Sequence, residues 1–80
     1  MRFQLDDTVR IVRLLVPERD VTGTSEHPPQ PRVGDIGTIA ADIGDDLYLV
    51  ESNTDDGATL WMAECNAAEI ELVERASQED

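Results

Sequence analysis

Carboxylates are the side chains that occur in this sequence in patterns able to do chemistry. Aspartates stand in adjacent pairs at positions 6–7, 45–46 and 55–56. The spacing closest to a calcium-binding loop begins at Asn53 and Asp55 and reaches Glu64 at its twelfth position. An EF-hand loop requires glycine at its sixth position, where this chain has Ala58. The residues before Glu64 also follow a strand pattern, so the spacing predicts no calcium site.

Histidine and cysteine, the other residue types that often carry catalysis or metal binding, occur once each. His27 lies in a proline-rich stretch and Cys65 at the end of an expected strand. A zinc site needs several such ligands, and a cysteine nucleophile needs a nearby base. A small chain also has little room for the deep cleft in which paired carboxylates cleave sugars. We therefore expect no enzyme activity, no metal and no cofactor.

The cysteine count and the apolar pattern bear on location. Because Cys65 is the only cysteine, no internal disulfide can form, which is typical of a reducing compartment. Residues 1–7 lack the apolar run of a signal peptide, and no stretch is long enough to span a membrane. These features predict a cytoplasmic protein without a membrane segment.

Net charge restricts the class of partner. The 80 residues carry 18 Asp and Glu against 6 basic residues, all arginine, for a net charge of -12. A body this negative repels nucleic acid and anionic membranes and attracts basic proteins. Its hydrophobic content of 40% is too high for a disordered acidic tail. A salt-adapted organism would also favour such acidity, and a GC-rich genome would explain the lack of lysine.

Short apolar runs separated by turn signals predict strands. Residues 8–15 are rich in β-branched side chains and end before Pro17, which cannot donate to a ladder. Residues 18–31 have few apolar side chains and predict a long loop, of a length that is usually functional or mobile. Residues 28–31 have the PxxP spacing of an SH3 ligand, but loop stiffening is the simpler interpretation.

The second half of the chain predicts further strands and tight turns. Strands are expected at 33–41, 47–52 and 59–64, with hairpin turns at 42–46 and 53–57. Asn66 and Glu69 have capping-box spacing, which predicts one helical turn over 66–68 before a last strand at 70–73. This order predicts an all-β, SH3-like, partly open five-stranded barrel. We expect a single domain over residues 1–75 and a frayed tail over 76–80.

The run from Leu5 to Val73 resembles the bacterial family called domain of unknown function 4926. The matching residues are Asp7-x-Val9-x-Ile11, Gly34-Asp35-Ile36-Gly37-Thr38-Ile39, Tyr48-x-Val50-Glu51 and Gly57. The chain departs from the family at Ser52, where an aromatic residue is usual, and in its longer loop. The resemblance implies the fold and supplies no catalytic residues.

Carboxylates on successive turns and strands predict a negative rim around the single tryptophan. We expect a partner to bind the following residues: Asp45, Asp46, Glu51, Asp55, Asp56, Trp61 and Glu64. Small acidic inhibitors hold basic enzymes with aromatic anchors inside a charged rim. The leading hypothesis is therefore an inhibitor, antitoxin or immunity-type protein that blocks a basic partner such as a toxin or nuclease.

Apolar residues on the expected outward faces support an alternative. Val12, Leu14, Leu47 and Leu49 would form either a second layer under the long loop or an interface. In the second case the chain is an accessory scaffold or assembly module that docks on a larger enzyme or forms a homodimer. The inhibitor hypothesis predicts binding that weakens sharply with salt, and the scaffold hypothesis predicts little salt dependence.

Overall fold

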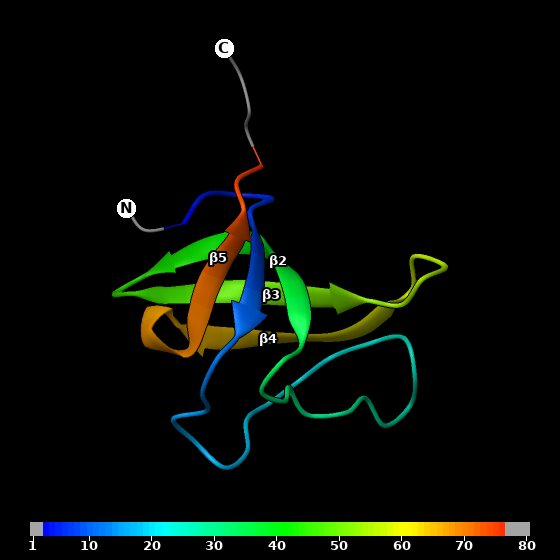
Figure 1. The fold of residues 1–80 in the computed structure, drawn as a ribbon. Helices are drawn as coiled ribbons and strands as arrows, with labels where there is room; N and C mark the ends of the chain where they lie inside the picture. Colours follow the sequence, from blue (N-terminus) through cyan, green and yellow to red (C-terminus); the bar gives the residue numbers. More distant parts are fainter. Residues whose placement is uncertain (1–2, 77–80) are drawn as a thin grey trace.

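The computed structural model describes residues 3–76, which form one antiparallel sheet (Figure 1). The strands are β1 (Thr8–Ile11), β2 (Ile36–Gly44), β3 (Leu47–Asn53), β4 (Thr59–Asn66) and β5 (Ile70–Glu74), and a 3-10 turn, η1 (Ala67–Glu69), precedes β5. Their order across the sheet is β4-β3-β2-β1-β5. The sheet does not close on itself, so the predicted all-β, SH3-like, partly open barrel is confirmed.

Alternation along the strands builds the core. Tyr48 and Val50 of β3 and Trp61 of β4 point inward, and each is at most 4% exposed. The edge of Phe3 packs against Tyr48, with ring centroids 5.2 Å apart. Gly37 on β2 leaves room for β3, since a Cβ at Gly37 would lie 2.7 Å from a Val50 methyl group. The core thus lies inside the curved sheet, with buried side chains from all five strands, from η1 and from Phe3 of the N-terminal segment.

The first strand is shorter than predicted. It ends at Ile11, because the next two residues, Val12 and Arg13, donate their backbone N–H groups to the carbonyl of Glu69. The chain therefore leaves the ladder and crosses over η1. The predicted helical turn exists one residue later than expected, with Asn66 as its N-cap and the full capping box to Glu69.

Two acidic hairpins stand at opposite ends of β3. Asp45 and Asp46 form the two-residue turn between β2 and β3, with φ values of 54° and 65°. Asp55 and Asp56 lie in the turn between β3 and β4, where Gly57 has a φ of 92°. Since β3 spans 7 residues and a strand rises about 3.3 Å per residue, the two turns are on the order of 20 Å apart. Figure 1 shows them on opposite sides of the barrel.

The long loop between β1 and β2 lies along the outer edge of β4. Thr22 forms an isolated antiparallel bridge with Met62, through N–H···O bonds of 3.0 and 2.8 Å. The Gln30 amide holds the loop together by accepting from the Arg19 N–H and donating to the Arg19 carbonyl. Pro31 is buried, so the PxxP segment stiffens the loop and is not presented as a free ligand.

The C-terminal segment is held at Ala76, whose N–H donates to Asp7 at 2.9 Å. The expected fraying therefore does not include Ala76, and residues 77–80 lie outside the described part. Within that part, no helix is long and apolar enough to cross a membrane.

Candidate functional site

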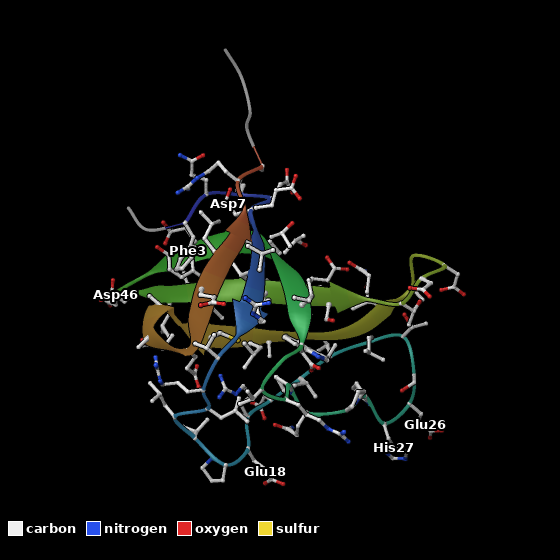
Figure 2. All side chains as sticks on the ribbon, viewed as in Figure 1. Phe3, Asp7, Glu18, Glu26, His27 and Asp46 are labelled. Carbon is white, nitrogen blue, oxygen red and sulfur yellow. The ribbon has the colours of Figure 1, made fainter. Side chains whose placement is uncertain are left out.

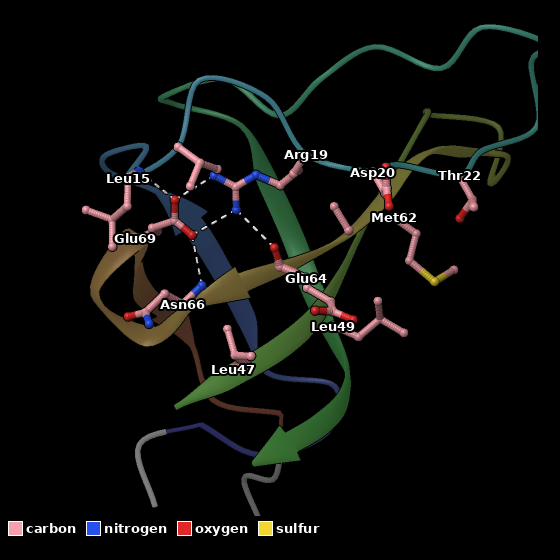
Figure 3. Close-up of a pocket in the computed structure, with 12 residues that line it drawn as sticks. Leu15, Arg19, Asp20, Thr22, Leu47, Leu49, Met62, Glu64, Asn66 and Glu69 are labelled. Atoms are coloured by element: carbon pink, nitrogen blue, oxygen red, sulfur yellow. Dashed lines mark hydrogen bonds and ion pairs between the residues drawn. The ribbon is translucent and has the colours of Figure 1, made fainter. Parts of the chain in front are cut away.

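A groove of about 520 Å³ lies between the long loop and the outward face of β3 and β4 (Figure 3). Leu47, Leu49 and Met62 form its apolar floor, and Leu15 and Val16 of the loop form part of its wall. The floor exists because β3 and β4 pair in register, with Leu49 opposite Glu64 and Leu47 opposite Asn66. These outward leucines therefore form the second layer under the long loop that the sequence suggested.

Glu69 is the buried carboxylate at one end of the groove. It is 2% exposed and accepts hydrogen bonds from the Leu15 N–H at 2.7 Å and the Asn66 N–H at 2.8 Å. The Arg19 guanidinium pairs with both carboxylate oxygens, at 2.8 and 2.6 Å. The hydrogen bonds from Arg19 are the largest influence, and they lower the pKa of Glu69 to about 2. The same bonds raise the pKa of Arg19.

Two further carboxylates line the groove without a cation. Asp20 and Glu64 are exposed, and neither side chain makes an ion pair or hydrogen bond with another described residue. The Glu64 backbone carbonyl accepts from Arg19 at 2.9 Å. The groove therefore combines an apolar floor with two carboxylates that form no ion pair within residues 3–76.

Trp61 is not a surface anchor, and that prediction was wrong. Its side chain is 0% exposed, and its indole N–H donates to Asp35 at 3.0 Å. Alternation along β4 points Trp61 into the core together with Ala63 and Cys65, while Met62 and Glu64 point outward. Trp61 is the largest of the fully buried side chains, so its inward position removes a large apolar area from water.

The predicted carboxylate rim is also not continuous. Asp45 and Asp46 are separated from Asp55 and Asp56 by the length of β3, and Figure 2 shows Asp46 at one end of the sheet. The Glu51 carboxylate accepts hydrogen bonds from the Thr59 and Asn53 side chains, and these bonds lower its pKa. Of the predicted set, Glu64 alone lines the groove.

The sequence analysis did not predict Asp20, Glu69 or Asp7 as site residues, because their contacts are with residues far away along the chain. Asp20 reaches the groove because the long loop folds back along β4, and no local pattern signals this. Glu69 carried a signal, the capping-box spacing with Asn66, but its pairing with Arg19 spans 50 residues. Asp7 is a second buried carboxylate, bound by Arg75 at 2.8 Å and by the Ala76 N–H (Figure 2).

The other candidate chemical groups lie apart from the groove's open face. Burial raises the pKa of the Cys65 thiol to about 11, which keeps it protonated at neutral pH. His27 is exposed on the long loop beside Glu26, away from the sheet (Figure 2). Among residues 3–76, no group of three or more His, Cys, Asp or Glu side chains could hold a metal ion.

Comparison with protein families, curated proteins and solved structures finds no significant match for this chain. The resemblance to domain of unknown function 4926 therefore remains a prediction. The groove and its charges have to support any function on their own.

Proposed function

We propose that this chain is a non-enzymatic acidic module that binds a basic partner protein in the cytoplasm, as an inhibitor, antitoxin or immunity protein does. The observation that carries the proposal is the groove, whose apolar floor lies beside the unpaired carboxylates of Asp20 and Glu64. A cationic side chain next to an apolar one on the partner would satisfy both features.

The distribution of arginines supports the same proposal. Arg10 pairs with Glu71, Arg19 with Glu69 and Arg75 with Asp7. Arg13 donates to the carbonyl of Ala68. Four of the six arginines are therefore engaged by groups of the protein itself, at exposed as well as buried positions. The net charge of -12 would speed association with a basic protein.

The test is co-expression with the products of the adjacent genes, followed by purification at low and high salt. We expect a complex with a basic protein whose affinity falls as salt rises. The double variant Asp20→Asn/Glu64→Gln should weaken it by about tenfold or more at low salt. The matched control is Glu26→Gln/Glu74→Gln, which removes the same charge from exposed positions that do not line the groove.

A generic basic protein such as cytochrome c separates specific binding from simple charge attraction. Specific recognition predicts that the partner binds far more tightly than cytochrome c and that only the partner discriminates between the two double variants. If both double variants weaken partner binding equally, the overall negative charge explains the binding and the groove is not the binding site. If no adjacent product binds, the inhibitor hypothesis loses its support.

The alternative, a scaffold or assembly module that can form a homodimer, is favoured by one specific observation. Leu14, Leu15 and Val16 are consecutive and 39%, 56% and 43% exposed. An interface centred on these residues would be apolar and nearly independent of salt. Sedimentation of the wild type and of Leu15→Ser at increasing concentration tests it, since self-association lost in Leu15→Ser would favour a homodimer.

A further inference from the structure

Glu69 connects the long loop to the body of the barrel. Four N–H groups converge on its carboxylate, from Leu15, Asn66 and twice from Arg19. Leu15 and Arg19 belong to the loop, whereas Asn66 ends β4. Leu15 is 56% exposed, so apolar packing of its side chain contributes little to holding the loop. The hydrogen bonds to the buried carboxylate therefore join these segments.

Arg19 extends this connection to the rest of the loop. Its guanidinium also donates to the Glu64 carbonyl at 2.9 Å, and its backbone is bound on both sides by the Gln30 amide. At the other end of the segment, the Thr22–Met62 bridge attaches the loop to β4. The loop over residues 15–22 is thus attached to the barrel near both of its ends. At the end nearer to Leu15 and Val16, Glu69 accepts three of the four hydrogen bonds that Leu15 and Arg19 donate to the barrel.

We infer that Glu69 is a positioning residue for the groove, holding residues 15–22 in place as its outer wall. The inference rests on the proposed function, since it assigns Glu69 a role in the site that function would use. Glu69 is only 2% exposed, too buried to contact a partner, and Figure 3 shows it beside Leu15 and bound to Arg19. Without the Glu69 carboxylate, residues 15–19 would move away from the barrel while Thr22 stays bound to Met62. The outer wall of the groove would then be displaced.

Glu69→Gln tests this, with Glu71→Gln as the matched control. Both substitutions remove a carboxylate that pairs with arginine, but the Arg10–Glu71 pair is exposed, at 46% and 47%. The first readout is tryptic cleavage after Arg19, and the second is the reaction of the Cys65 thiol, buried beside Arg19, with an aromatic disulfide reagent. We expect Glu69→Gln to raise both rates by about tenfold or more and Glu71→Gln to leave them within about twofold.

Dilute urea distinguishes a positioning role from a purely stabilising one. Local opening exposes little surface, so the raised rates should depend weakly on urea well below the unfolding midpoint. Rates in Glu69→Gln within twofold of the wild type would overturn the inference. Rates that rise with the urea dependence of global unfolding would overturn it as well. If Glu69→Gln does not fold, Arg19→Lys keeps the cation but loses the paired geometry, and the same outcomes apply.

Binding is the last readout, with a random dodecapeptide library displayed on phage as the probe. Selection on the wild type should enrich peptides that join Arg or Lys to apolar residues and that bind Asp20→Asn/Glu64→Gln more weakly. We expect these peptides to bind Glu69→Gln about tenfold more weakly and Glu71→Gln unchanged. If the protease and thiol rates show that the loop of Glu69→Gln is open but the selected peptides bind this variant as tightly as the wild type, the positioning role alone is refuted. Enrichment without basic residues would instead refute the proposed function, while the protease and thiol results would still decide whether Glu69 holds the loop.

Discussion

Replacing Asp7 with Asn should destabilise the fold much more than the same change at its neighbour Asp6. The Asp7 side chain is 0% exposed and accepts from the Gln4 N–H at 2.8 Å, Arg75 at 2.8 Å and the Ala76 N–H at 2.9 Å. Asn offers one oxygen in place of two, so its NH2 group would face a donor. The substitution also leaves Arg75 without its buried counter-charge.

The expected loss in the free energy of unfolding depends on how deeply each partner of Asp7 is buried. Breaking a buried ion pair costs about 3–5 kcal/mol. Because Arg75 is 38% exposed, water replaces part of what it loses, and the value should be discounted. The remaining bonds, from the Gln4 and Ala76 N–H groups, are charge-assisted and partly buried. We therefore expect a loss of about 2–3 kcal/mol, equivalent to a fall in Tm of roughly 10–20 °C for a domain of this size.

Asp6→Asn is the control because it removes the same charge one position away. Asp6 is exposed and has a φ of 70°, a conformation that Asn adopts as readily as Asp. It should change stability by less than about 0.5 kcal/mol. The assay is urea unfolding followed by Trp61 fluorescence, since the buried indole becomes hydrated on unfolding. If the free energies of unfolding of the two variants differ by less than about 0.5 kcal/mol, Asp7 does not stabilise the fold by joining Gln4 to Arg75 and Ala76.

Three further predictions concern Glu69, the β2–β3 turn and Gly37. The pKa of Glu69 is lowered from 4.5 to about 2, so its pairing should contribute on the order of 3 kcal/mol above pH 4.5 and lose this as pH falls toward 2. Urea titrations across that window should show a flatter pH profile for Glu69→Gln. Asp45→Asn/Asp46→Gly should stabilise the fold by about 1 kcal/mol in thermal unfolding, because both positions have positive φ; a lower Tm would contradict the turn geometry. Gly37→Ala should lose about 2 kcal/mol in the same assay, since its Cβ would meet a Val50 methyl at 2.7 Å; an unchanged Tm would contradict this close approach.

Local patterns were sufficient to predict the elements of the fold. Alternation at Tyr48 and Val50 identified the inward face of β3, and the Asp-rich turn and Gly57 located the hairpin that follows it. Asn66 and Glu69 located η1 to within one residue. These signals depend on neighbours within a few positions, which is the range over which hairpin turns and helix caps are decided. The first strand was extended too far, because a contact with the distant Glu69 ends it.

The acidic, all-β character of the chain and the SH3-like order of its strands and turns could be predicted without coordinates. Which carboxylates lie close together could be learned only from the folded chain. The tertiary structure placed the Asp45 and Asp55 turns at opposite ends of β3 and buried Trp61. It also brought Asp20 and Glu64, which are 44 positions apart in the sequence, to one groove. The physical reason is that carboxylates of similar local sequence acquire different roles through burial and through partners that are distant along the chain. Glu69 is buried and paired with Arg19, whereas Glu64, five residues earlier, is exposed and forms no ion pair with another described residue.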